Sequence, residues 1–326
     1  MERKKKKAKY SVVSLFSGIG GLDLGFEFAG FKVIWANDFD KYAVETYKKN
    51  VNNNIFLGDI RKLKNSIPKH DILIGGFPCQ PFSTLGKLQG FNDESRGNLF
   101  FDILDVLKNH DTKICVLENV KNLLNHDKGN TFKIIKEELS ELGYEVYYKI
   151  LNSKDFGVPQ QRNRIFIVAI NSKYFNIKDF VFPNGYMLDV TTQDLLDDLV
   201  DDKYFLTKKI VGTIMGEGTK GYIVKPTIDK PISKTLCATM HKMHRASQDN
   251  YVTDNVNYER NCNKTKRVNI RKLTPNECRK LQGFPSDWIQ VVSDCQAYKQ
   301  FGNAVTVNVA YEIAKQVYKY LEENLL

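Results

Sequence analysis

One of the six cysteines stands in a loop whose neighbours favour a reactive thiol. Cys79 lies in the run GGFPCQPFS at residues 75–83, where an apolar stretch ends in two glycines. Pro78 holds Phe77 in an extended conformation, so the chain turns stiffly and presents the thiol. Most lone cysteines are buried apolar side chains, but polar and proline neighbours favour a nucleophile here. The polar segment 84–97, with three glycines, is predicted to close over a substrate.

A glycine-rich turn and two later aspartates suggest a nucleoside ligand. In FSGIGG, residues 16–21, glycines let the backbone approach a ligand and a helix N-terminus favours negative charge. A dinucleotide fingerprint would need glycine where Asp23 stands, so a nicotinamide cofactor is disfavoured. Asp38 lies about 20 residues after the glycines, where a carboxylate can accept hydrogen bonds from both ribose hydroxyls. Asp59 could bind an adenine amino group. Because no Walker-type lysine follows, these residues predict an adenosine cofactor without a phosphate.

Three further polar runs follow predicted strands or precede a helix. Glu118, in LENV, ends an apolar strand, where a carboxyl group can be held protonated or share a proton with a base. Taken alone, it is more commonly an ordinary surface acid. In QQRNR, residues 160–164, Arg162 and Arg164 stand two residues apart and lead into another predicted strand. The run QFGNAV, residues 300–305, precedes the last predicted helix.

The elements that must position these residues alternate along the first half of the chain. β-branched runs predict strands at 11–15, 32–35, 54–57, 71–74, 113–117, 145–150 and 164–170. Helical spacing predicts helices at 22–29, 42–50, 99–109 and 131–142, the last ended by Gly143. This alternation predicts an α/β fold with a mostly parallel sheet that binds ligands at the carboxyl ends of its strands.

The alternation stops after residue 170. A helix is predicted at 192–200, followed by glycines among short β-prone pieces, which indicates a smaller, loop-rich domain that carries specificity. Thr274, Pro275 and Glu277 predict a capped helix start, and Gly283 ends that helix. A final helix at 307–323 is expected to pack on the first domain. We therefore expect a basic tail at 1–9, a catalytic and cofactor-binding domain at 10–170, the smaller domain and a hinge at 171–295, and a return segment at 296–326.

Composition narrows the class of protein. With 326 residues, 42% of them apolar and 26% charged, the chain is neither disordered nor collagen-like. No apolar run reaches the roughly 20 residues of a membrane span, and the basic start lacks a signal-peptide cleavage site. The cysteines form no CxxC pair, so neither a zinc site nor a disulfide framework is predicted, and a reducing cytoplasm is expected.

The net charge of +10 is unevenly distributed. Residues 1–9 hold six basic residues and one acid, residues 241–280 hold ten and four, and residues 189–202 hold six acids and no base. A basic tail is usually only solvated, whereas an internal basic segment interleaved with tyrosine and histidine suits a polyanion. The charge pattern therefore favours nucleic acid as a partner.

Together these runs resemble the DNA (cytosine-5) methyltransferases of bacterial restriction-modification systems, in unpermuted motif order. Only residues 171–269 lie outside the resemblance. Any single run would be weak, but so many in one consistent order are not explained by chance. The matching runs are FSGIGG, ND at 37–38, GDI at 58–60, GGFPCQPFS, RGNLFFDIL at 96–104, LENV, QQRNRIF, RKLTPNECRKLQGFP at 271–285 and FGNAVTVNVA at 301–310.

The resemblance implies a Rossmann-like S-adenosylmethionine-dependent methyltransferase sheet with a smaller, loop-rich target-recognition domain. It implies a pocket for S-adenosylmethionine built from Phe16, Gly18, Gly20, Gly21, Asp38, Phe39, Asp59, Ile60, Pro78, Leu99, Asn303 and Val305. No metal is expected.

The resemblance also implies the chemistry. Cys79 would attack carbon 6 of cytosine, Glu118 would hydrogen-bond or protonate ring nitrogen 3, and Arg164 would bind the carbonyl at carbon 2. Carbon 5 would then take the methyl group, and loss of its proton would expel Cys79. Asn119 and Arg162 are expected to brace this site.

Carbon 6 is unreachable inside a stacked duplex, so the base must be flipped out of double-stranded DNA. Base-edge reading would fall to residues 171–269, where Thr235 and Leu236 resemble the short Thr-Leu element of such recognition domains. We expect a monomer that methylates a specific short sequence and protects DNA from a partner restriction endonuclease. The residues expected to contact DNA are Gln80, Ser83, Thr235, Leu236, Lys242 and Arg245.

Two alternatives stay open at this stage. The RNA-acting branch of the same fold would methylate a tRNA cytosine, although the Cys-Phe-Thr run typical of that branch is absent from the small domain. A DNA-binding regulator on an inactive methyltransferase fold is disfavoured because Cys79, Glu118, Arg164 and Asn303 are all present.

Overall fold

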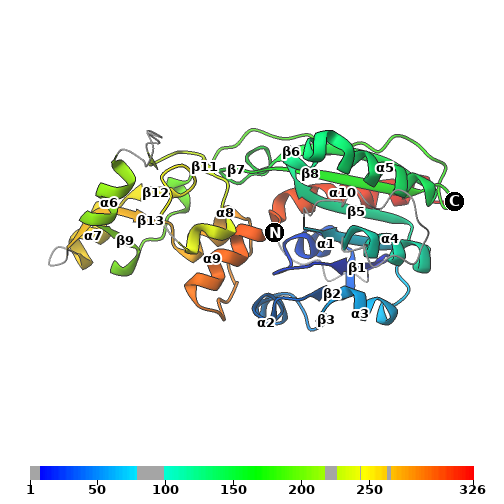
Figure 1. Cartoon of the computed structure of the whole chain (residues 1–326), viewed down its shortest axis with the longest axis horizontal. Helices are drawn as coiled ribbons and strands as arrows, with labels where there is room; N and C mark the ends of the chain where they lie inside the picture. Colours follow the sequence, from blue (N-terminus) through cyan, green and yellow to red (C-terminus); the bar gives the residue numbers. More distant parts are fainter. Residues whose placement is uncertain (1–7, 79–98, 217–225, 243, 263–265) are drawn as a thin grey trace. The chain divides into compact units, whose positions relative to one another are not determined.

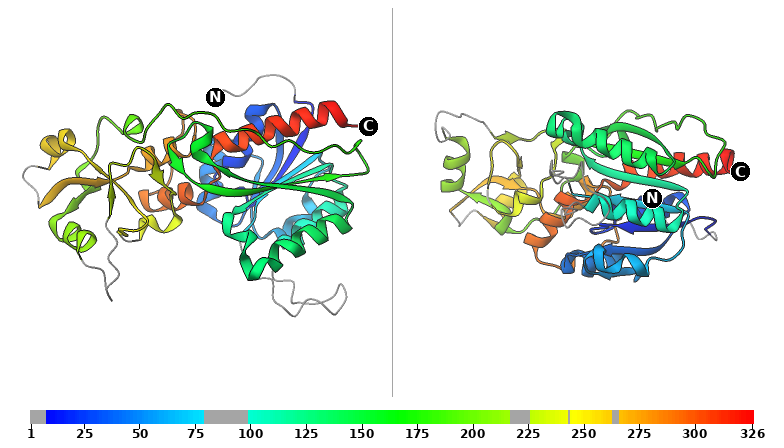
Figure 2. Two further views of the ribbon diagram at one scale, coloured as in Figure 1. Left: turned by 90° about the horizontal axis from the view of Figure 1, so that it is seen from above. Right: turned by 45° about the vertical axis from the view of Figure 1, so that its right-hand side comes forward.

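The computed structural model describes residues 8–78, 99–216, 226–242, 244–262 and 266–326. These divide into two compact units, which Figures 1 and 2 show in three views. Unit 1 comprises Met1–Leu151, Asn163–Asn184 and Val309–Leu326, and unit 2 comprises Asn152–Arg162 and Gly185–Asn308. This division differs from the expected boundaries at both ends of the smaller domain. Residues 152–162 and 296–308 cluster with unit 2, whereas residues 171–184, expected in the smaller domain, cluster with unit 1. The role of each unit stays a prediction.

Unit 1 is built on a seven-stranded sheet. In sheet order the strands are β3 (Ile55–Leu57), β2 (Lys32–Asp38), β1 (Ser11–Leu15), β4 (Ile72–Gly76), β5 (Ile114–Val120), β8 (Asn163–Asn171) and β6 (Tyr144–Asn152). The pairs from β3 to β5 are parallel, whereas β8 runs antiparallel to β5. Each of these strands lies within a few residues of its predicted position, and the mostly parallel arrangement is confirmed.

Helices cover both faces of this sheet, as Figure 2 shows. On one face, α3 (Ile60–Leu63), α4 (Leu99–His110) and α5 (Asn130–Glu141) pack into a shared core with Leu15, Leu73 and Leu117. On the other lie α1 (Gly21–Ala29) and α10 (Val307–Asn324), while α2 (Lys41–Asn50) precedes β3. A Cβ at Gly25 would lie 2.4 Å from the Ala310 Cβ, so α1 and α10 touch as closely as backbone allows. The predicted packing of the last helix on the first domain is confirmed.

Unit 2 carries more regular structure than the sequence predicted. Its four-stranded sheet has the order β10 (Thr227–Ile228), β12 (Asn250–Thr253), β13 (Arg267–Lys272) and β9 (Phe205–Thr207). A separate pair joins β11 (Ser233–Lys234) to β7 (Gln160–Gln161). The helices are α6 (Lys208–Met215), α7 (Asn255–Asn261), α8 (Pro275–Leu281) and α9 (Asp294–Asn303).

Helix α8 begins as predicted, since Thr274 and Glu277 form a capping box and Pro275 occupies the first turn. Gly283, with φ of 72°, follows its end. The helix predicted at 192–200 is wrong, because only Gln193–Leu195 forms a single 3-10 turn. Asp197 instead accepts hydrogen bonds from the Thr274 hydroxyl and the Asn276 amide and pairs with Lys280 at 2.8 Å. These long-range partners hold the acidic segment in a non-helical path.

Two features are absent from the described residues. No helix among them is long and apolar enough to cross a membrane. In the same part of the chain, no three His, Cys, Asp or Glu side chains gather so that they could hold a metal ion.

Candidate active site

The glycine-rich turn after β1 forms a left-handed backbone cradle in unit 1. Phe16, Gly18 and Gly20 have φ of 55°, 56° and 86°. A left-handed conformation is strained for a phenylalanine, and such strain is typical of functional sites. A Cβ at Gly18 would meet nothing within 4 Å, so open space lies beside that residue. The turn leads into α1, whose first residue is Gly21 and whose N-terminus carries partial positive charge.

Asp38 ends β2 directly beside this cradle. One carboxylate oxygen accepts the Gly18 N–H at 2.8 Å and the other accepts the Asp40 N–H at 2.8 Å. Burial raises the pKa of this carboxyl above its ordinary value, while the two backbone N–H donors oppose the rise. The carboxylate is thus oriented by backbone, and each oxygen keeps capacity to accept another hydrogen bond. The next side chain, Phe39, is 77% exposed, which is unusual for a phenylalanine.

Asp59 follows β3 at the same edge of the sheet. Its carboxylate caps α3 by accepting the Arg61 N–H at 3.0 Å and also binds the Arg61 guanidinium. The Arg61 hydrogen bond lowers the pKa of Asp59, so it is held ionised. The next residue, Ile60, is buried in the core on that side of the sheet.

An ion pair lies at the carboxyl end of β5. Glu118 Oε1 lies 3.0 Å from Arg164 Nε, and both side chains are largely buried. The antiparallel register places Arg164 opposite Val120, two residues beyond Glu118, so neighbouring strands supply the acid and the guanidinium. Arg164 also donates to its neighbour's carbonyl at Asn163, at 2.8 Å.

Contacts at the same edge of the sheet hold the chain where it leaves β4. Gly76 pairs with Glu118, and the Asn119 amide donates to the Phe77 carbonyl at 2.9 Å. Asn119 therefore holds the backbone immediately before Pro78, and the bracing role expected of it in the site stays a prediction. Cys79, Gln80 and Ser83 lie outside the described residues, which resume with Leu99 at the start of α4.

In unit 2, the Arg162 guanidinium binds three backbone carbonyls. The residue is 1% exposed and donates to the carbonyls of Leu236, Gly302 and Ala304 at 2.9, 3.0 and 2.7 Å. A buried guanidinium shared among three carbonyls cannot also bind a substrate carbonyl through the same donors. This geometry suits the bracing role expected of Arg162, which stays a prediction.

Gln160, Gln161 and Arg162 hold the Thr235–Leu236 dipeptide by hydrogen bonds, which together form a clasp. Gln160 accepts the Leu236 N–H at 2.9 Å, and its amide donates to the Leu281 carbonyl at 2.9 Å. The Thr235 hydroxyl donates to the Gln161 carbonyl at 2.6 Å. Both backbone polar groups of Leu236 are therefore held by side chains of the QQR run, a role of Gln160 that sequence reasoning missed.

Glycine is required where α9 approaches this dipeptide. A Cβ at Gly302 would lie 2.3 Å from the Ala238 N atom, which no side chain could tolerate. The same helix ends at Asn303, which is exposed, and Val305 is nearly buried. Both belong to unit 2, and their place in a cofactor pocket stays a prediction.

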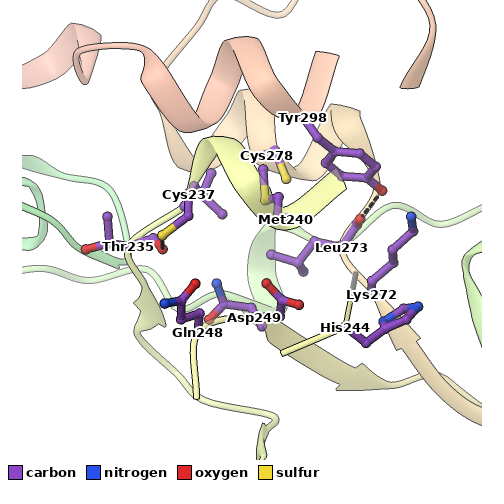
Figure 3. A pocket seen from close by; sticks show the side chains of 12 residues that line it. Thr235, Cys237, Met240, His244, Gln248, Asp249, Lys272, Leu273, Cys278 and Tyr298 are labelled. Carbon is purple, nitrogen blue, oxygen red and sulfur yellow. Dashed lines mark hydrogen bonds between the residues drawn. The ribbon is translucent and has the colours of Figure 1, made fainter. Parts of the chain in front are cut away.

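A small pocket in unit 2 lies beside Thr235 (Figure 3). Its walls include His244, Asp249, Lys272 and Tyr298, and the Lys272 ammonium lies 4.7 Å from the centre of the Tyr298 ring. Burial lowers the pKa of both Lys272 and His244. Of the residues expected to contact DNA nearby, Lys242 is exposed, and the Arg245 guanidinium donates to Gln248 at 3.0 Å.

Comparison with known proteins shows which family the chain belongs to. The family model described as C-5 cytosine-specific DNA methylase matches residues 10–319. The chain belongs to that family. It is 42% identical to the type II methyltransferase M.SsoII of Shigella sonnei, over 97% of this chain and 82% of the relative. It is 37% identical to the type II methyltransferase M.HhaI of Haemophilus parahaemolyticus, over 94% and 93%.

Solved structures of C-5 methyltransferases share the fold of this methylase. A mutant of Spodoptera frugiperda DNMT2 superimposes with a TM-score of 0.73 at 21% identity, covering 95% of this chain and all of that one. An Entamoeba histolytica methyltransferase gives 0.72 at 22% identity, over 98% and 100%. The family and fold inferred from the motifs are confirmed, and the chain is a DNA (cytosine-5-)-methyltransferase. The predicted roles of individual residues remain predictions.

Proposed function

We propose that this methylase transfers a methyl group from S-adenosylmethionine to carbon 5 of a flipped cytosine in a short, specific duplex sequence. The observation that carries the proposal is the buried Glu118–Arg164 ion pair at the strand edge where β4 leads to Cys79. An acid and a guanidinium held 3.0 Å apart suit a cytosine ring, because nitrogen 3 needs a proton donor and the carbonyl at carbon 2 needs a positive charge.

The residues at the glycine turn fit the adenosine part of S-adenosylmethionine. The cradle is open beside Gly18, and the Asp38 carboxylate is oriented there with acceptor capacity for two ribose hydroxyls. Phe39 offers an exposed ring for stacking, and Asp59 and Ile60 line the adjoining strand end. When bound, S-adenosylmethionine supplies an electrophilic methyl group. Phe16, Gly20, Gly21, Pro78, Leu99, Asn303 and Val305 complete the proposed pocket.

The chemistry of this chain's own residues then follows in order. The Cys79 thiolate forms a bond to carbon 6, while Glu118, which must take up a proton when the base binds, donates a hydrogen bond to nitrogen 3 and Arg164 binds the oxygen at carbon 2. Electron density reaches carbon 5, where the bond to the methyl group would form as the bond between that methyl group and the sulfur of S-adenosylmethionine breaks. Loss of the proton at carbon 5 to a base restores the double bond and breaks the bond to Cys79.

The likeness to type II methyltransferases supports a place in a restriction-modification system. In such a system the methyl group protects host DNA from a partner endonuclease. We further propose that Gln80, Ser83, Thr235, Leu236, Lys242 and Arg245 contact the duplex, and that the enzyme acts as a monomer.

The test is sequencing of modified cytosines in DNA from cells that express the wild-type chain or Cys79→Ala. We expect 5-methylcytosine at one short sequence with the wild type and none with the variant. Methylation of a transcript but not of a duplex carrying the same sequence would overturn the proposal in favour of an RNA substrate.

A further inference from the structure

A buried carboxyl group lies behind the glycine turn and takes no direct part in the proposed chemistry. Asp23, in the first turn of α1, has no exposed surface, so it cannot touch a bound methyl donor. One carboxylate oxygen accepts the Ser14 hydroxyl at 2.9 Å and the other accepts the Tyr47 hydroxyl at 2.8 Å. Burial raises its pKa to about 7 against the pull of these two donors. Burying a carboxyl group costs free energy of folding, so we expect Asp23 to have a function that offsets this cost.

The hydroxyl groups of Ser14 and Ser17 form a hydrogen-bonded row that connects Asp23 to the glycine turn. Because Ser14 gives its proton to Asp23, the Ser14 oxygen is available as an acceptor, and the Ser17 hydroxyl lies 2.8 Å from it. The Ser17 oxygen in turn accepts the Asn37 N–H at 3.3 Å, and the Ser17 N–H donates to the Asn37 carbonyl at 2.9 Å. Asp23 therefore sets the direction of the Ser14 proton, and the Ser17 hydroxyl, which also lies 3.1 Å from the Ser14 carbonyl, has the Ser14 hydroxyl oxygen as its nearer acceptor.

Ser17 is the residue before Gly18, whose N–H holds the Asp38 carboxylate. The Asn37 amide also donates to the carbonyls of Phe56 and Gly58, at 3.1 and 2.9 Å. The row therefore ties the glycine turn to the ends of β2 and β3, where the proposed ribose and adenine contacts lie.

The Tyr47 arm is a separate connection. Its ring packs beneath the turn, since a Cβ at Gly20 would lie 2.9 Å from the Tyr47 Cε2. Its hydroxyl reaches Asp23 but is not part of the row through Ser14 and Ser17. Removing that hydroxyl costs a buried hydrogen bond to the same carboxylate and leaves the row intact.

We propose that Asp23 is a positioning residue for the methyl donor, acting through Ser14 and Ser17 to hold the glycine turn against Asp38. This inference rests on the proposed use of S-adenosylmethionine at that turn. An amide at position 23 keeps the shape but has only one acceptor oxygen, so one hydroxyl must reverse its proton or lose its partner. Reversal at Ser14 removes the hydroxyl acceptor at 2.8 Å from Ser17 and leaves it only the Ser14 carbonyl at 3.1 Å, which loosens the turn.

The experiment compares Asp23→Asn, Ser14→Ala and Tyr47→Phe by calorimetric titration with S-adenosylmethionine and by steady-state methylation. We expect Asp23→Asn and Ser14→Ala to raise the Kd and KM for the donor about 10-fold or more, the loss typical of one buried hydrogen bond. The kcat at saturating donor and the Kd for DNA should change little. Tyr47→Phe should lower the melting temperature yet leave the donor Kd within about 3-fold of wild type.

Each result is decisive. Equal losses of donor affinity in all three variants would mean that only general stability is at stake, and unchanged affinity in Asp23→Asn and Ser14→Ala would mean that the row is idle. Either outcome overturns the positioning role. If the wild-type protein itself binds no S-adenosylmethionine, the proposed function fails and the inference fails with it, which separates that case from failure of the row alone.

Discussion

At the scale of single residues, what matters most is the contrast between cysteines with different surroundings. Cys115 is fully buried in β5, where burial raises the pKa of its thiol, and Cys295 is exposed. Of the six cysteines in the sequence, Cys79 is the one that comes shortly after β4, whose last residue, Gly76, pairs with Glu118. Reactivity is therefore predicted from position relative to the acid and not from exposure alone.

The first prediction concerns the order of bond changes at Cys79. A target cytosine with fluorine at carbon 5 has no proton to lose after methyl transfer, so the Cys79 bond should persist. We expect a covalent complex under denaturing conditions, only with S-adenosylmethionine, mapping to Cys79 by peptide mass spectrometry. Glu118→Gln should slow its formation by roughly 10² to 10⁴-fold. Cys295→Ala is the matched control and should form the complex normally, whereas attachment at Cys295 would refute the mechanism.

A buried histidine gives the second prediction. Nδ1 of His70 lies 2.8 Å from the Pro68 carbonyl and Nε2 lies 2.9 Å from the Thr112 hydroxyl, and burial lowers the pKa of His70 to about 4. The unfolded chain binds this proton near pH 6.5, so His70 stabilises the fold above that pH and the contribution disappears as pH falls toward 4. The full effect is roughly 3 kcal/mol.

The measurement is the free energy of unfolding between pH 7.5 and 4.5 for wild type and His70→Gln. Asp23 acts in the opposite direction, because its raised pKa favours the folded state as pH falls through about 7. Only the difference between the two proteins isolates His70. We expect that difference to shrink as the pH is lowered, and a constant difference would contradict the prediction.

At the scale of elements, the short β7 strand holds the Thr235–Leu236 dipeptide. Gln160 is fully buried and Gln161 is exposed, although both stand in the same strand. Of the two glutamines, Gln160 binds Leu236 through its side chain, whereas Gln161 binds Thr235 through its backbone carbonyl. The pair therefore offers a test in which one substitution breaks the clasp and its neighbour leaves it whole.

The third prediction uses that pair. Gln160→Ala leaves the Leu236 N–H without its acceptor, which costs about 1 to 3 kcal/mol. We expect affinity for the cognate duplex to fall about 10-fold, with little change for an unrelated duplex, because a loosened dipeptide loses sequence reading first. Gln161→Ala should behave as wild type. Equal binding curves for the two variants would argue against a role for the clasp.

At the scale of the whole molecule, the net charge of +10 and the internal basic segment 241–280 set the response to salt. The fourth prediction is that DNA affinity falls by about 10³ to 10⁵ between 50 and 200 mM salt if 6 to 10 phosphates are contacted. Binding of S-adenosylmethionine should change little over that range. Deleting residues 2–9 should weaken only nonspecific binding. A flat salt response for DNA would count against the basic segment as the docking surface.

The fifth prediction assigns sequence specificity to residues 171–269, which lie between the recognised motifs and match none of them. Grafting this segment onto a related methylase should transfer the methylated sequence, as read by bisulfite sequencing. Persistence of the host's own sequence would place specificity elsewhere in the chain.

The sequence by itself determined much of unit 1, because its signals are local. Apolar runs of strand length and the glycine turn each depend on residues within a few positions, as does the Thr274 capping box in unit 2. The candidate acid Glu118 and the ribose-binding candidate Asp38 were found because strand ends in a parallel sheet share one edge.

The tertiary structure decided what depends on distant partners. Arg162 and Arg164 are two residues apart, yet one holds three carbonyls within unit 2 and the other pairs with Glu118 within unit 1. Residues 192–200 have helical spacing, but the contacts of Asp197 with Thr274, Asn276 and Lys280 override it. The row from Asp23 through Ser14 to Ser17 was equally hidden, since a hydroxyl in a sequence does not reveal which buried acceptor takes its proton.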